Sequence, residues 1–90
     1  MRLYADWMVL ADERILEFLQ ENGPASPSEM ADDARIGFSR EYLGRRCREY
    51  LRPYGLVSKS GQGVYFITED GEAYLAGDLD ADDLDTDDAG

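Results

Sequence analysis

Five arginines lie close together in residues 38–56, in the stretch FSREYLGRRCREYLRPYGL. Arginine is always charged, and its planar guanidinium group binds phosphate oxygens and guanine edges through paired hydrogen bonds. The chain around these arginines is acidic, with 20 Asp and Glu against 9 Lys and Arg and a formal net charge of -11. A cationic segment in so acidic a chain indicates a surface that binds a polyanion.

The positive charge is confined to one part of the chain. Residues 35–59 carry seven basic residues and two acids, a net charge of +5, whereas the rest carries two basic residues and eighteen acids, a net charge of -16. Ion pairs such as Glu41 with Arg45 or Arg45 with Glu49, four residues apart, would also suit a merely solvated helix. We favour the polyanion surface because the arginines outnumber the nearby acids.

The residue types argue against catalysis. The chain has no histidine and one cysteine, Cys47, so it lacks the usual general base and any cluster of zinc ligands. It also lacks a glycine-rich loop that would cradle a phosphate. We therefore expect a protein that is not an enzyme and that uses no cofactor and no metal.

Composition also suggests a setting. The apolar runs are too short to cross a bilayer and no secretion signal is visible, so we expect a cytoplasmic protein without a membrane partner. Abundant acids, with arginine supplying eight of the nine basic residues, resemble proteins of salt-accumulating halophilic archaea. At molar salt the screening length falls to about 3 Å, which largely removes the self-repulsion of such a surface.

Two helices are predicted ahead of the basic segment. The first lies within residues 4–23, with apolar residues at helical spacing, Asp12 as its N-cap and a stop at Asn22-Gly23-Pro24. The second covers residues 27–34. It begins with a capping box in which Ser26 is the N-cap and Glu29 follows three residues later, with Pro27 in the first turn.

A third helix is predicted over residues 39–52, with Ser39 as its N-cap. The spacing predicts one buried face, formed by Leu43, Cys47, Tyr50, Leu51 and Tyr54. Cys47 is therefore interpreted as a core residue and not as a nucleophile. The opposite face carries Glu41, Arg45, Arg48 and Arg52, while Tyr42 and Arg46 fall on a flank.

The remaining chain predicts a hairpin, a helix and a tail. LVSK and VYFIT are β-rich runs joined by SGQG, residues 60–63, which is typical of a β-hairpin. Thr68 is placed to cap a last helix over residues 69–77. From Asp78 onward seven of thirteen residues are Asp. The sequence therefore predicts a folded domain at 1–77 and a disordered acidic tail at 78–90.

This order of elements resembles the winged helix-turn-helix. The stretches GPASPSEMA, FSREYLGRRCREYLRPYGLV, GVYFIT and TEDGEAYL are similar to haloarchaeal winged-helix regulators related to a halophage repressor. The implied fold is α+β and mainly α, with three helices, a β-hairpin wing and a C-terminal helix. One departure is the stretch at 34–38, which is longer than a minimal turn between the two helices of the motif.

The resemblance implies a sequence-specific DNA-binding transcriptional regulator, a repressor, that reads the major groove with helix 39–52. Candidates for reading base edges lie in its first half and are Ser39, Arg40, Glu41, Tyr42 and Arg45. Candidates for phosphate contacts are Arg46, Arg48 and Lys59, and Gln62 at the wing tip would meet the minor groove or a phosphate.

The expected partners are double-stranded DNA and a second copy of the chain. Two regions are candidate dimer surfaces: the first helix with Trp7 and Met8 before it, and the last helix through Tyr74 and Leu75. The same residues could instead cover the core of a monomer. An alternative function is a winged-helix module that binds another protein of a transcription assembly.

Overall fold

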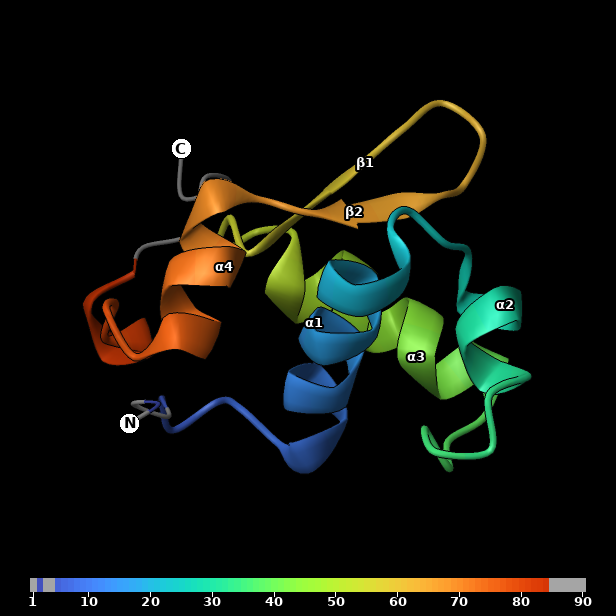
Figure 1. Ribbon diagram of the computed structural model, residues 1–90, viewed down its shortest axis with the longest axis horizontal. Coiled ribbons are helices and arrows are strands. Elements are labelled where there is room, and N and C mark those ends of the chain that lie inside the picture. Colours follow the sequence, from blue (N-terminus) through green and yellow to red (C-terminus); the bar gives the residue numbers. More distant parts are fainter. Residues whose placement is uncertain (1, 3–4, 85–90) are drawn as a thin grey trace.

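The computed structural model describes residues 2 and 5–84 of the chain and shows helices with one β-hairpin lying across them (Figure 1). The helices are α1 (Leu10–Asn22), α2 (Pro27–Ala31), α3 (Arg40–Arg46) and α4 (Glu69–Ala76). A π-helical turn, η1 (Cys47–Leu51), continues α3, and a short 3-10 turn, η2 (Ala81–Asp83), follows α4. The hairpin strands are β1 (Val57–Lys59) and β2 (Tyr65–Ile67). The predicted winged helix-turn-helix fold is confirmed.

Side-chain caps start three of the helices where the sequence predicted them. The Ser26 hydroxyl accepts the Glu29 N–H at 3.2 Å, and the Glu29 carboxylate accepts the Ser26 N–H at 2.9 Å. The Ser39 hydroxyl likewise accepts the Tyr42 N–H at 3.2 Å. Thr68 caps α4 by accepting the Gly71 N–H at 3.1 Å. Each cap satisfies a backbone N–H that the first turn of the helix leaves without a partner.

The core lies between α1 and the elements around it. Its fully buried side chains come from nearly every element and include Ile15, Leu16, Leu19, Met30, Leu43, Cys47, Leu51, Leu56, Val57 and Tyr74. Helix α4 packs so closely on the start of the hairpin that a Cβ at Gly71 would collide with the Leu56 carbonyl oxygen. Tyr74 and Leu75, candidates for a dimer surface, are buried in this core.

The base of the hairpin is fixed to the helices. Its strands are antiparallel, and Lys59 pairs with Tyr65 at the last register position before the turn. The Ser60 N–H donates to the Val64 carbonyl at 2.8 Å, which closes the turn that was predicted as the wing tip. Ala25 and Tyr65 exchange backbone hydrogen bonds at 3.0 and 2.9 Å. This pairing ties the loop before α2 to the wing.

Three predicted helix details are wrong. Val9, not Asp12, occupies the N-cap of α1, and Asp12 is a buried residue in the first turn. Helix α2 ends at Ala31 instead of residue 34. The third helix is α-helical only to Arg46, because the Arg52 N–H donates to the Cys47 carbonyl, five residues back, at 2.9 Å. Such a bond widens the helix into a π turn.

The folded part extends past the predicted boundary at Gly77. The Asp80 carboxylate accepts the Asp82 N–H at 3.0 Å and starts η2. Ala81 is fully buried, and Leu79 and Leu84 pack against the core. Residues 78–84 are therefore part of the folded body, contrary to the prediction of a disordered tail from Asp78. The rest of that predicted tail, 85–90, lies outside the described residues. Within the described ranges, no helix has the length and apolar character that crossing a bilayer requires.

The buried position of Ala81 predicts that η2 stabilises the domain. Ala81→Asp should lower the free energy of unfolding by about 2–4 kcal/mol, because a carboxylate would be buried without a partner. The exposed neighbour provides the control, since Asp82→Ala should change stability by no more than about 0.5 kcal/mol. Denaturant unfolding in molar salt measures both, and equal stability of the two variants would contradict the packing of residues 78–84.

The Cys47 thiol is fully buried, and burial, with a smaller contribution from the charge of Asp12, raises its pKa to about 12. A thiol in the unfolded chain titrates near pH 8.5, so we expect modification by a disulfide reagent to be at least about 100-fold slower in the folded protein at pH 9. Because the folded pKa is raised, stability should also fall as the pH rises above about 8.5. Comparable rates with and without denaturant would show that the helix is oriented differently.

Candidate nucleic-acid interface

The outer face of α3 and η1 is cationic. Arg40, Arg45, Arg48 and Arg52 are all exposed, as is Glu41, while Leu43, Cys47 and Leu51 on the other side are fully buried. The predicted division of this helix into a core face and a charged face is therefore confirmed. Tyr50 and Tyr54, predicted for the core face, are only half-buried at its edge.

The exposed arginines are only loosely held by acids of the same helix. The Nε–Oε distances are 3.2 Å from Arg40 to Glu41 and 3.6 Å from Arg45 to Glu49, and Arg48 lies 3.4 Å from the same Glu49 carboxylate. All five side chains are at least 45% exposed. Exposed pairs of this kind contribute at most about 1 kcal/mol. The guanidinium groups can therefore exchange a carboxylate for a phosphate at little cost.

Arg46, predicted as a phosphate contact, does not belong to this exposed face. Its Nε donates to Asp12 Oδ1 at 2.9 Å, and its Nη2 donates to Asp12 Oδ2 at 2.7 Å and to the Trp7 carbonyl at 2.9 Å. The side chains of Arg46 and Asp12 are 9% and 0% exposed. The hydrogen bonds to Asp12 raise the pKa of Arg46. Three of the five N–H donors of this guanidinium are therefore engaged within the fold.

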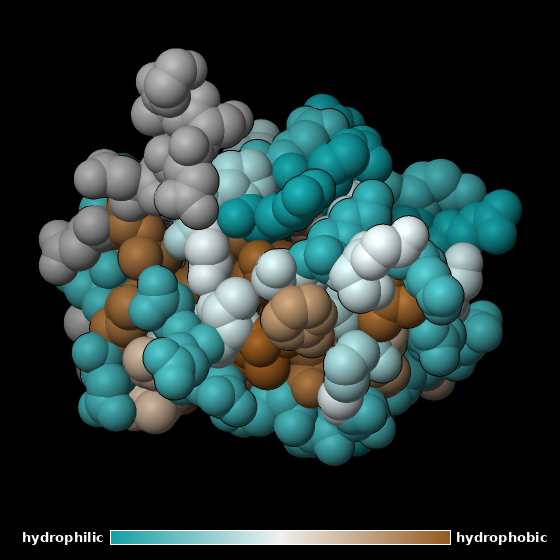
Figure 2. Space-filling view, turned by 90° about the horizontal axis from the view of Figure 1, so that it is seen from above, coloured by the Kyte–Doolittle hydropathy of each residue, from teal (hydrophilic) through white to brown (hydrophobic). Residues whose placement is uncertain are grey.

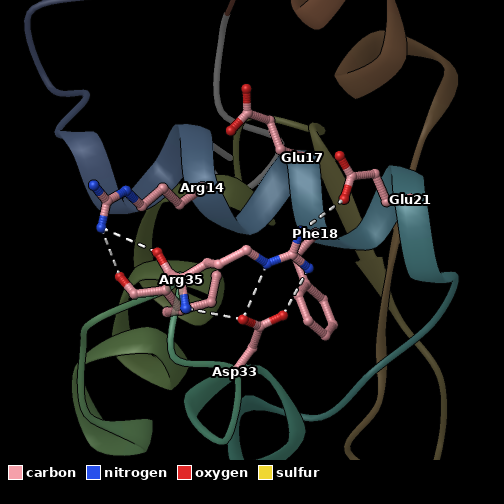
Figure 3. Close-up of a pocket in the computed structure, with 7 residues that line it drawn as sticks. Arg14, Glu17, Phe18, Glu21, Asp33 and Arg35 are labelled. Atoms are coloured by element: carbon pink, nitrogen blue, oxygen red, sulfur yellow. Dashed lines mark hydrogen bonds and ion pairs between the residues drawn. The ribbon is translucent and has the colours of Figure 1, made fainter.

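Arg35 is also engaged within the fold. Figure 3 shows its guanidinium beside Asp33, which it contacts at 2.8 Å, and near Glu21 of α1 at 3.7 Å. The hydrogen bond from Arg35 lowers the pKa of Asp33. Arg14 of α1 donates to the carbonyls of Arg35 and Ile36 at 3.3 and 3.0 Å. The long turn between α2 and α3 is thus held against α1, over an open pocket that Phe18 and Ile36 help to line.

Five cations of the basic segment remain for a ligand, against two acids. They are Arg40, Arg45, Arg48 and Arg52 of the helix and Lys59 of the wing, and with Glu41 and Glu49 they give the helix face and the wing together a net charge of +3. Among the described residues Arg52 forms no ion pair. Arg52 was predicted to lie on the outer face but was not predicted as a site residue, although its spacing of four residues from Arg48 places both on the same side of the helix.

The wing lies beside the end of this helix. A groove between η1 and the hairpin base is lined by Arg48 and Arg52 on one side and by Val57 and Ser58 on the other. Lys59 is exposed, with its ammonium group 5.9 Å from the centre of the Tyr65 ring, and Gln62 is exposed in the turn. Figure 2 looks onto the hairpin side of the molecule, where hydrophilic residues surround exposed apolar ones.

The first turn of α3 contains the remaining predicted residues. Ser39 is exposed but its hydroxyl is used as the cap. Tyr42 is half-buried and packs against Phe38, with ring centres 5.4 Å apart. Of the predicted site residues of the helix, Arg40, Glu41, Arg45 and Arg48 are therefore exposed, Tyr42 is half-buried and Arg46 is buried. It places Lys59 and Gln62 on the separate wing.

Comparisons with known proteins agree with this architecture. A family model for the winged helix-turn-helix phage repressor matches residues 1–87. The chain is 36% identical over 90 residues to the repressor protein of Halobacterium phage phiH, covering 93% of this chain and 97% of that protein. The crystal structure of the PhiH1 repressor-like protein from Haloarcula marismortui is similar with a TM-score of 0.89 and 41% identity, covering 96% of this chain and 97% of that one. The relatives are repressor proteins, so the expectation of a non-enzymatic protein is confirmed. The chain belongs to the winged helix-turn-helix phage repressor family.

Proposed function

We propose that this chain is a sequence-specific DNA-binding transcriptional repressor that reads the major groove with α3. One observation supports this most directly: a chain with a net charge of -11 presents a net +3 on the outer side of the third helix and the wing. In helix-turn-helix proteins this helix enters the major groove, and its N-terminal residues contact base edges. The family's repressor relatives supply the regulatory role.

The positions along the helix suggest a division of roles. Arg40, Glu41 and Arg45 are exposed in α3, where arginine suits guanine O6 and N7 and glutamate suits the cytosine amino group. Ser39 and Tyr42 would contribute at the entry of the helix. Arg48 and Arg52 line the groove beside the wing, and Lys59 is exposed on the wing itself. All three would contact phosphates, which orient the protein without specifying sequence. Gln62 at the wing tip would reach the minor groove or a neighbouring phosphate.

We further propose that the protein binds a palindromic site as a homodimer, because one module offers few base contacts. Of the residues predicted for this surface, Met8 is buried and Trp7 is half-buried. The exposed apolar residues at the start of α1 are Val9 and Leu10, at 39% and 50%, and these are the candidate surface. Sedimentation of the protein in molar salt, alone and with a selected duplex, measures the stoichiometry. One chain bound per duplex at saturation would reject the dimer.

Selection of bound fragments from haloarchaeal genomic DNA in molar potassium chloride tests the function. The full chain should enrich a defined sequence motif, while the matched variant Arg40→Ala with Arg45→Ala should enrich none. Enrichment by neither protein, with both folded, would reject sequence-specific DNA binding and favour the alternative of a protein-binding winged-helix module.

Arg45 and Lys59 should differ in how they affect DNA binding. Arg45→Ala should lower affinity for the selected site by about 1–3 kcal/mol and relax the preference at one base pair, because a bidentate guanine contact is lost. Lys59→Ala should weaken all duplexes alike and reduce the salt slope of log K by about 1. Titrations of matched and scrambled duplexes over a salt series measure both. A uniform loss for Arg45→Ala would contradict its role as a base reader.

A further inference from the structure

One buried ion pair joins α1 to α3. Both oxygens of Asp12, in the first turn of α1, accept hydrogen bonds from Arg46, the last residue of α3, at 2.9 and 2.7 Å. Asp12 Oδ2 also accepts the Val9 N–H at 3.0 Å, so the same carboxylate caps α1. The two charged groups are therefore compensated by each other and by directional hydrogen bonds.

An aromatic layer extends this link to the turn that follows α3. The Arg46 guanidinium lies 3.8 Å from the centre of the Tyr50 ring, and it also donates to the Trp7 carbonyl. The Trp7 ring stacks on Tyr54, with centroids 4.2 Å apart and planes within 4° of parallel. Two segments that are distant in sequence, residues 7–12 and residues 46–54, therefore meet around this guanidinium and the aromatic rings beside it.

Arg46 is next in sequence to a cation of the proposed DNA face. Successive residues of an α-helix are related by a rotation of about 100°, so a fixed direction for the Arg46 side chain also fixes the direction of Arg45. Arg45 itself has only an exposed contact with Glu49 at 3.6 Å. The rotation of α3 about its axis is thus set from its buried side.

Salt acts differently on exposed ion pairs and on a buried ion pair such as Asp12 with Arg46. At 1 M salt the screening length is about 3 Å, so exposed ion pairs are largely screened, whereas a buried pair is screened much less. Buried ion pairs are often replaceable by apolar residues without loss of stability, but apolar contacts do not impose a direction. The two-pronged fork of arginine does impose one.

We propose that Asp12 and Arg46 are positioning residues that hold α3 at the rotation needed for base recognition. The proposal rests on the proposed function. In this proposal Arg46 affects the discrimination between DNA sequences without contacting DNA. This role replaces the phosphate contact that was predicted from its charge.

Two variants test it in molar salt. The double variant Asp12→Asn with Arg46→Met leaves no buried charge and keeps an acceptor for the Val9 N–H, and Arg46→Lys keeps the charge but loses the fork. The matched control is Arg2→Met with Glu17→Gln, which removes the two ion pairs of Arg2 with α1, to Glu17 at 2.6 Å and to Glu13 at 2.9 Å. Circular dichroism establishes the folded fraction of each protein at the assay temperature.

The duplexes are the site selected by the natural chain and a scrambled version of it. Both Asp12/Arg46 variants should lose about tenfold or more in affinity for the selected site, the loss expected from a misplaced base contact, and less than about twofold for the scrambled duplex. The control should match the natural chain on both. Emission from Trp7, the only tryptophan, should shift to the red and become more accessible to acrylamide in the two variants and not in the control.

Several results would overturn the proposal. One is a folded Asp12/Arg46 variant that prefers the selected duplex over the scrambled duplex as strongly as the natural chain does. Another is an equal loss of affinity for both duplexes, since that would indicate a phosphate contact. If the double variant does not fold, Arg46→Lys alone decides by the same criteria. If the natural chain selects no site, the proposed function fails. Trp7 emission then tests whether the Asp12–Arg46 pair holds α1 and α3 together. Unchanged Trp7 emission in both variants would reject that role of the pair.

Discussion

The third helix has to pack into the core with one side while it carries cations into solvent with the other, and much of the structure follows from this requirement. Leu43, Cys47 and Leu51 are fully buried along one side, and the exposed arginines occupy the other. The π turn at 47–51 widens the helix where these two sides continue toward the hairpin. Since Leu56 and Val57 are also fully buried, the strand that leaves this helix starts in the same core, and the wing begins next to the cationic face.

Electrostatics divides the basic segment into two groups with different tasks. Arg46 is bound to Asp12 of α1, and Arg35 is bound to Asp33 of its own turn and lies near Glu21 of α1, whereas the remaining cations stay at the surface with weak partners. At molar salt the long-range attraction between exposed cations and DNA is largely screened. Recognition must then depend on short-range hydrogen bonds with fixed directions, and these require a helix whose orientation does not vary. The buried arginine would therefore hold the helix in place, while the exposed arginines would form these hydrogen bonds.

Local signals could be predicted from the sequence, and long-range pairings could not. Ser26, Ser39 and Thr68 were recognisable as caps because a cap depends on residues three positions away. Asp12 resembled an N-cap for the same reason, yet its carboxylate is committed to Arg46, 34 residues along the chain. A helical wheel places Arg46 on a flank but does not reveal a partner on another helix. Ala81 was missed because one small residue among aspartates has no apolar periodicity, although its site in the core is fully buried.

Helix α1 contacts α3 at its C-terminal end and also contacts the turn that leads into its N-terminal end. Asp12 binds Arg46 at the C-terminal end of α3, and Arg14, two residues later, donates to the carbonyls of Arg35 and Ile36 in the turn before α3. The Arg14 guanidinium also lies 5.9 Å from the centre of the Phe38 ring, directly before the Ser39 cap. A long turn between the two helices of the motif would ordinarily leave the approach angle of the second helix free to vary. Here the turn length adds little freedom, because the hydrogen bonds from Arg14 fix its backbone to the same helix that fixes Arg46. The contacts that hold α3 therefore lie in the first turns of α1, beside the exposed Val9 and Leu10 of the proposed dimer surface.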